Sequence, residues 1–137
     1  MSFLFSTKSN ATLNHLWLLI YRVTLSVFMM THGLPKLNRL LSGDIAGFPD
    51  PFGIGSTMSL VLAVFGEVIA PVMVLLGLTA RFASIPVVVT MATAAFLIHA
   101  NDPFRQQELA LLFMAGFMTI LIMGGGKYSL DNLLGRR

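Results

Sequence analysis

A carboxylate, Glu67, lies inside a run of residues that is otherwise almost wholly apolar from Met58 to Leu78. Placing an acidic side chain at the centre of a membrane helix costs about 2.5 to 3.5 kcal/mol, so a charge retained there is a candidate functional group or half of a buried pair. Pro71 follows four positions later and, because it has no N–H, leaves the carbonyl oxygen of Glu67 without its helical donor. The sequence therefore predicts a kink at Glu67, and interrupted helices beside charged residues form ion and substrate sites in transporters.

Arg22 is the candidate partner of Glu67 within the apolar part of the chain. With a rise of about 1.5 Å per residue, the two groups differ in depth by about 7 Å, which is the reach of one Arg side chain. Buried charges usually persist by pairing, so the sequence allows an Arg22–Glu67 ion pair. It leaves open whether such a pair serves a function or only holds the helices together.

His32, His99 and Glu108 lie at the ends of apolar runs, at one predicted level of the protein. Together with Arg22 and Glu67 they are the candidate ligand-binding residues, and Glu67 and His99 are the candidates for proton exchange. Two histidines at one depth could also bind haem or, with a carboxylate, a metal. His32 lies about 80° from the helical face that carries Arg22, and this disfavours haem and metal. The sequence contains no catalytic motif, phosphate loop or Rossmann glycine pattern.

The composition indicates that lipid surrounds the chain. Only 11% of the residues are charged and 55% are hydrophobic, whereas soluble domains carry about 25% charged residues. No segment combines dense Lys and Arg with aromatic residues, which disfavours nucleic-acid binding. The chain has no cysteine, and this excludes disulfides, thiolate nucleophiles and iron–sulfur ligation by its own residues.

Four apolar runs are long enough to cross a bilayer as helices, at residues 16–34, 57–78, 82–100 and 108–123. Because backbone polar groups must be satisfied inside lipid, we predict an all-α fold, an antiparallel four-helix bundle that forms one domain over residues 1–137. Each ionisable side chain shares its helical face with small residues, which mark helix–helix contacts in membranes. The polar groups are therefore expected to face the interior of the bundle.

The connections between these runs predict a functional loop and an orientation. Residues 35–56 are rich in Gly and Pro and form a connection long enough to suggest a functional loop. Lys8, Arg81 and Lys127 fall on one side together with the two C-terminal arginines, which predicts that this side is cytoplasmic and that both termini lie there. The amphipathic tail at 127–134 is expected to lie on the membrane surface.

Several segments, in this order and spacing, resemble the DoxX family of small bacterial membrane proteins. They are His32-Gly-Leu-Pro-Lys-Leu37, Phe65-Gly-Glu67, Leu78-Thr-Ala-Arg-Phe82, Phe96-Leu-Ile-His-Ala-Asn101, Glu108-Leu-Ala-Leu-Leu112 and Gly124-Gly-Gly-Lys-Tyr-Ser-Leu-Asp131. Gly125 departs from the family, which often has Pro in a Gly-Pro-Gly turn. The resemblance implies a four-helix protein of the bacterial inner membrane. It also implies a link to quinone-coupled oxidoreductase subunits and oxidative-stress complexes, with His32, Glu67, His99 and Glu108 as candidate residues.

Three hypotheses for the function follow. The first is an accessory subunit of a membrane oxidoreductase, in which a quinone enters between the helices and exchanges protons with Glu67 or His99 while a protein partner supplies electrons. The second is a small proton-coupled transporter, acting as a homo-oligomer. The third is a structural or assembly scaffold in which an Arg22–Glu67 pair fixes the helices. In each case the lipid bilayer is a partner.

Overall fold

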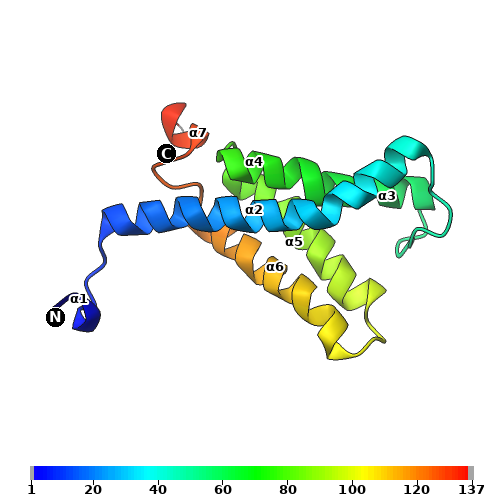
Figure 1. The fold of residues 1–137 in the computed structure, drawn as a ribbon, viewed down its shortest axis with the longest axis horizontal. Coiled ribbons are helices and arrows are strands. Elements are labelled where there is room, and N and C mark those ends of the chain that lie inside the picture. Colours follow the sequence, from blue (N-terminus) through cyan, green and yellow to red (C-terminus); the bar gives the residue numbers. More distant parts are fainter. Residues whose placement is uncertain (1, 136–137) are drawn as a thin grey trace.

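The computed structural model describes residues 2–135, which form a bundle of long helices with two short helices at its margins (Figure 1). The elements in chain order are α1 (Ser2–Phe5), α2 (Ala11–Ser42), α3 (Ser56–Val64), η1 (Phe65–Ile69), α4 (Ala70–Leu76), α5 (Ala80–Thr93), η2 (Ala94–Ile98), α6 (Phe104–Met123) and α7 (Leu130–Leu133). The elements η1 and η2 are single π-helical turns, so that α3–η1–α4 and α5–η2 each form one continuous helix.

The predicted membrane architecture is confirmed. Within residues 2–135, four helices are long and apolar enough to cross a membrane: Ala11–Ser42, Ser56–Leu76, Ala80–Ile98 and Phe104–Met123. The last three agree with the predicted spans to within a few residues. The protein is therefore an all-α, multi-pass membrane protein.

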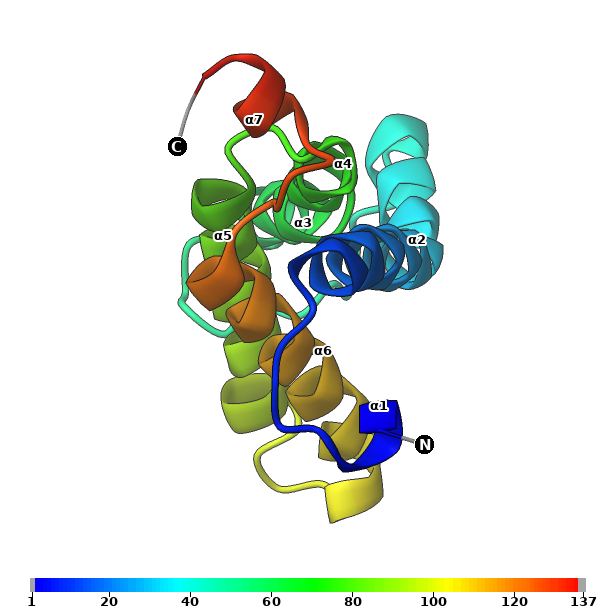
Figure 2. The same ribbon diagram turned by 90° about the vertical axis from the view of Figure 1, so that its left-hand side faces the viewer.

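The four spans are arranged as two antiparallel pairs that cross at an angle (Figures 1 and 2). One pair consists of α2 and the α3–η1–α4 helix, and the other of α5 and α6. The pairs meet in a core of small and apolar side chains that includes Met29, Ala70, Ala83 and Phe117. We call the end that carries the loop 43–55 the loop end, and the end where residues 124–135 lie the tail end.

The helix α2 is longer than predicted, and this extension determines what it can contact. The sequence suggests a span at 16–34, but α2 begins at Ala11 and continues through Pro35 to Ser42. Proline inside a helix usually costs about 3 kcal/mol. The helix continues because Leu37 and Leu40, beyond the proline, pack against a buried apolar cluster on α3 and η1.

The loop at 43–55 is ordered around one carboxylate, Asp50. Its Oδ1 accepts hydrogen bonds from the Ser59 hydroxyl at 2.8 Å and from the Ile54 N–H at 3.0 Å, and its Oδ2 accepts one from the Gly55 N–H at 2.8 Å. These bonds, the one from Ser59 first, lower the pKa of Asp50 below its ordinary value. The loop is thereby attached to the first turn of α3.

The tail at residues 124–135 binds the end of the bundle through backbone and carboxylate contacts, and its position on the membrane surface stays a prediction. The Asp131 carboxylate accepts hydrogen bonds from the N–H groups of Thr79 and Ala80, at 2.8 and 2.9 Å. The Asp131 N–H donates to the carbonyl of Gly77 at 2.9 Å. Asp131 thus supplies the N-terminal cap that the first residues of α5 lack.

Candidate functional site: a Lys–Glu pair beside an apolar cavity

The π turn η1 carries Glu67 and is the local form of the predicted interruption. Ala70 N–H donates to the carbonyl of Phe65, five residues back, so the helix widens by one residue just before Pro71. Such turns accommodate a missing helical donor and occur frequently at functional sites. The second π turn, η2, ends the third span in the same way, with His99 N–H donating to Ala94.

Glu67 pairs with Lys36, a residue that the sequence suggests lies in a loop. The Nζ of Lys36 lies 2.5 Å from the Oε1 of Glu67. The Glu67 side chain is 3% exposed and that of Lys36 is 32% exposed, so the lysine is the accessible member of the pair. The other carboxylate oxygen, Oε2, is buried and has no hydrogen-bond partner within the described residues.

Gly33 allows α2 to approach η1 closely enough for Lys36 to pair with Glu67. A Cβ at Gly33 would lie 2.5 Å from the carbonyl oxygen of Glu67 and 2.7 Å from the side chain of Val68, so only glycine permits this approach of α2 to η1. Lys36 lies three positions further along α2 and therefore on the same helical face. The close contact at Gly33 places the ammonium group directly beside the carboxylate.

The Arg22–Glu67 pair that the sequence allows is not formed. Arg22 is buried, donates from Nη1 to the carbonyl of Val74 at 3.3 Å and from Nη2 to the carbonyl of Tyr128, and forms no ion pair with Glu67. It lies about three helical turns from Gly33 along α2, near the tail end. The depth estimate was wrong because it took the ends of the apolar runs as level, whereas α2 extends well beyond its apolar run at both ends.

A cavity of about 200 Å³ adjoins the Lys36–Glu67 pair at the loop end. The loop covers one side of it, η1 and α3 form a second side, and α5 with η2 forms a third. The lining is predominantly apolar and consists of Lys36, Phe48, Pro49, Pro51, Phe52, Ser59, Leu62, Ala63, Phe65, Glu67, Pro86, Val89, Thr90, Thr93, Ala94 and Ile98.

Few polar groups line this cavity, and the bonds they already form determine whether each can donate or accept a hydrogen bond. The hydroxyls of Thr90 and Thr93 donate to carbonyls of their own helix at 2.8 and 2.9 Å, so towards the cavity they can act only as acceptors. Lys36 is the only ammonium group in the lining and can donate to a ligand while it pairs with Glu67. The cavity therefore suits a flat apolar ring that bears a hydrogen-bond acceptor.

The other predicted site residues lie elsewhere. His99 forms a contact of 2.7 Å between its Nδ1 and the Oδ2 of Asp102, at the turn before α6. His32 is exposed and packs edge-on against the ring of Phe113 at 5.6 Å. Glu108 is exposed on the first turns of α6. None of these residues, nor Arg22, lines the cavity, and their roles in ligand binding or proton exchange stay predictions.

Metal binding finds no support in the described residues. Within residues 2–135 no group of three or more His, Asp or Glu side chains is placed to hold a metal ion.

Lys36 is the site residue that the sequence reasoning missed. The sequence pattern that indicates Lys36 is one helical face of α2. This face carries the buried residues Arg22, Ser26, Met29 and Gly33, and it continues beyond Gly33. Adding three positions to Gly33 gives Lys36. Pro35 obscured this pattern because a proline usually ends a helix.

The fold and this site define a small multi-pass membrane protein with a buried Lys–Glu pair beside an apolar cavity. The chain belongs to the DoxX family, whose model matches residues 17–100. The matched region contains Gly33, Lys36, Glu67 and Pro71. An uncharacterized protein of Haemophilus influenzae is 28% identical over 124 residues, which cover 85% of this chain and 82% of that protein. No solved structure matches the chain.

Proposed function

We propose that this protein is a membrane redox subunit that binds the ring of a quinone in the loop-end cavity. The observation that carries the proposal is the buried Lys36–Glu67 pair in the wall of a cavity that is otherwise almost wholly apolar. A charged pair of this kind is expensive to bury and is a functional-site hypothesis by default. We place the protein in the bacterial inner membrane, with the tail end towards the cytoplasm.

The size and position of the cavity support a head group that enters from lipid. Its volume of about 200 Å³ is below the range of about 300 to 1,000 Å³ that is usual for whole ligands, so it suits one ring. Leu62, Phe65, Val89 and Ile98 line the cavity and are also 40–55% exposed on the surface that lipid covers. A ring can therefore enter between α3–η1 and α5–η2 while its isoprenoid chain stays in the bilayer.

The pair can supply one of the two protons that quinone reduction requires. Reduction of a quinone adds two electrons and two protons, and the protons go to the two carbonyl oxygens. The Lys36 ammonium group donates first a hydrogen bond and then one proton to a reduced oxygen, and the partly exposed amine takes up a proton from water again. The second reduced oxygen takes its proton from water, and the Glu67 carboxylate stabilises the ammonium form of Lys36. The electrons come from a reduced flavin or iron–sulfur centre of a partner protein; this chain has no cysteine to hold a cluster of its own.

The test is whether purified protein binds quinone through this pair. We expect quinone in the solvent extract of wild-type protein, and about tenfold weaker binding of a short-chain ubiquinone by Lys36→Met and Glu67→Gln, since the first removes the charge-assisted donor to the ring and the second removes the carboxylate that holds this donor in place. Asp44→Asn is the matched control because it removes an exposed carboxylate that does not line the cavity. Equal binding by all four proteins, or no binding by the wild type, overturns the proposal.

A structural role is the second candidate, favoured by the close packing of Gly33 on η1. In that case Lys36 and Glu67 hold the register of α2 against the second span. The double variant Lys36→Met with Glu67→Gln then loses stability but keeps every ligand and partner interaction of the wild type. Proton flux driven by a solute in liposomes, abolished in Glu67→Gln, would instead indicate the transporter hypothesis.

A further inference from the structure

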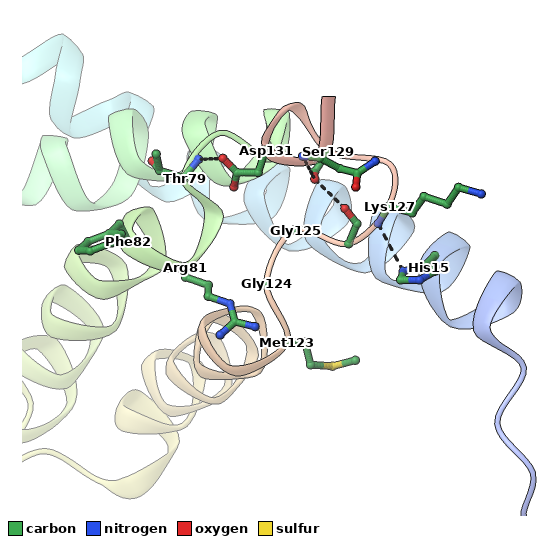
Figure 3. A pocket seen from close by; sticks show the side chains of 12 residues that line it. His15, Thr79, Arg81, Phe82, Met123, Gly124, Gly125, Lys127, Ser129 and Asp131 are labelled. Atoms are coloured by element: carbon green, nitrogen blue, oxygen red, sulfur yellow. Dashed lines mark hydrogen bonds between the residues drawn. The ribbon is translucent and has the colours of Figure 1, made fainter. Parts of the chain in front are cut away.

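A second and larger cavity lies at the tail end, opposite the proposed quinone site. It has a volume of about 1100 Å³ and is formed where the start of α2, the start of α5, the end of α6 and the tail meet (Figure 3). Its lining comprises His15, Thr79, Arg81, Phe82, Met123, Gly124, Gly125, Gly126, Lys127, Ser129, Asp131 and Asn132. Nothing in the proposed redox function uses these residues.

The lining carries an excess of positive charge. Arg81 and Lys127 are exposed, and neither forms an ion pair within the described part of the chain. The only acidic residue in the lining is Asp131, whose two oxygens already accept the N–H groups of Thr79 and Ala80. The cavity therefore has cations available to a ligand, whereas its carboxylate is bound to the protein backbone.

The three glycines at 124–126 let the tail turn closely past neighbouring side chains and add backbone donors. Gly124 and Gly126 have positive φ angles of 83° and 76°, a conformation that side chains disfavour. The guanidinium of Arg81 lies across Gly124, with its Nε 3.0 Å from the position that a Cβ would take (Figure 3). The N–H groups of Gly125 and Gly126 donate to no acceptor within residues 2–135. Free N–H groups of successive residues form concave sites for anions.

His15 adds a further donor at the edge of this cavity. Its Nδ1 accepts the N–H of Lys127 at 3.3 Å, so the neutral ring carries its proton on Nε2. The donors from α2, α5 and the tail thus surround one space (Figure 3).

An apolar rim adjoins these donors. Phe82, next to Arg81, is 77% exposed, and Met123, at the end of α6, is 53% exposed. Both lie at the ends of candidate spans, where the lipid head groups are expected. A cationic cavity bordered by exposed apolar side chains at this level matches a ligand that is anionic at one end and hydrocarbon at the other.

We propose that the tail-end cavity binds the phosphate diester of an anionic membrane lipid. Arg81 is the principal charge contact, Gly125 and Gly126 donate backbone N–H groups to the phosphate, and the acyl chains lie against Phe82 and Met123. This site would join α2, α5, α6 and the tail through one lipid. A free phosphate ion shares the head-group chemistry, but it would leave the apolar rim without a partner.

The experiment compares lipid retention by wild-type protein, Arg81→Gln and Arg105→Gln, each purified in an uncharged detergent. Arg105 is the matched control because it is an exposed arginine at the loop end. We expect native mass spectrometry to show bound phosphatidylglycerol or another anionic lipid on wild type and on Arg105→Gln. Arg81→Gln should retain roughly tenfold less, the effect of losing one charge-assisted hydrogen bond. Retention by Arg81→Gln equal to that of the control overturns the proposal.

A second measurement separates the source of the phosphate and does not depend on retention. Delipidated wild-type protein is heated with short-chain phosphatidylglycerol, short-chain phosphatidylcholine or inorganic phosphate. We expect phosphatidylglycerol to raise the melting temperature more than phosphatidylcholine does, and this difference to vanish in Arg81→Gln but persist in Arg81→Lys. Equal shifts from the two lipids, or a shift from inorganic phosphate alone that matches phosphatidylglycerol, contradict a lipid site.

Discussion

Replacing Lys36 by methionine isolates the energetic role of the buried pair. Methionine keeps most of the length and apolar volume of lysine but removes the ammonium group 2.5 Å from Glu67. Breaking a fully buried ion pair costs about 3 to 5 kcal/mol, because the remaining charge has no partner. Since a third of Lys36 is exposed, solvent already screens part of this interaction, and we expect a loss of about 2 kcal/mol in the free energy of unfolding.

The reverse variant, Glu67→Gln, should be less harmful. It leaves the charge on Lys36, whose long stem can move the ammonium group towards water. The double variant Lys36→Met with Glu67→Gln should recover most of the stability that Lys36→Met loses, since no unpaired charge is then buried.

Unfolding in mixed micelles, followed by far-ultraviolet circular dichroism, gives the four free energies of this cycle. The reasoning is refuted if Lys36→Met falls within about 0.5 kcal/mol of wild type, as surface substitutions do. It is also refuted if the double variant is less stable than Lys36→Met.

Three further predictions concern the surroundings of the site. Gly33→Ala should lower stability by about 1 to 3 kcal/mol and weaken quinone binding, because a Cβ would lie 2.5 Å from the Glu67 carbonyl; thermal unfolding and ligand titration measure the two effects, and Asn38→Ala at an exposed position of the same helix is the control. Asp50→Asn should make the loop 43–55 more sensitive to protease at neutral pH. The pKa of Asp50 is lowered in the fold, so its contribution is present above its unfolded pKa of about 4 and is lost as the pH falls through the lower pKa of the folded state; the difference from wild type should shrink progressively as the pH is lowered below about 4. Asp131→Ala should cost about 0.5 to 2 kcal/mol by uncapping α5, and unfolding that matches wild type would show that the tail does not stabilise the bundle.

The four spans were predictable because the length of an apolar run is a local property of the sequence. The interruption at Glu67 was predictable for the same reason, since Pro71 acts on a carbonyl four positions away. The true partner of Glu67 was not, because the end of α2 depends on how Leu37 and Leu40 pack against a helix that follows a long loop. Local rules end the helix at Pro35, and this error moved Lys36 into a loop.

The contacts of Arg22 were hidden for a different reason. Its two acceptors are backbone carbonyls, one in α4 and one at Tyr128 in the tail, and a carbonyl has no signature in the sequence. The tail itself is short and irregular, so no periodic pattern indicates where it docks. A contact between residues separated by most of the chain requires the packed structure.

Arg22 and Lys36 now have distinct roles although they share one face of α2. Arg22 donates to the carbonyl of Val74 in the last turn of α4, a position where a cation complements the helix dipole. It lines neither cavity, and its buried Nε has no partner among the described residues, so its contacts with α4 and the tail account for a structural role. The Lys36 side chain is 32% exposed and lines an apolar cavity. The Glu67 carboxylate that pairs with it has one oxygen, Oε2, without a hydrogen-bond partner among the described residues. The difference between these two cations is what directs the search for a ligand to Lys36 and Glu67.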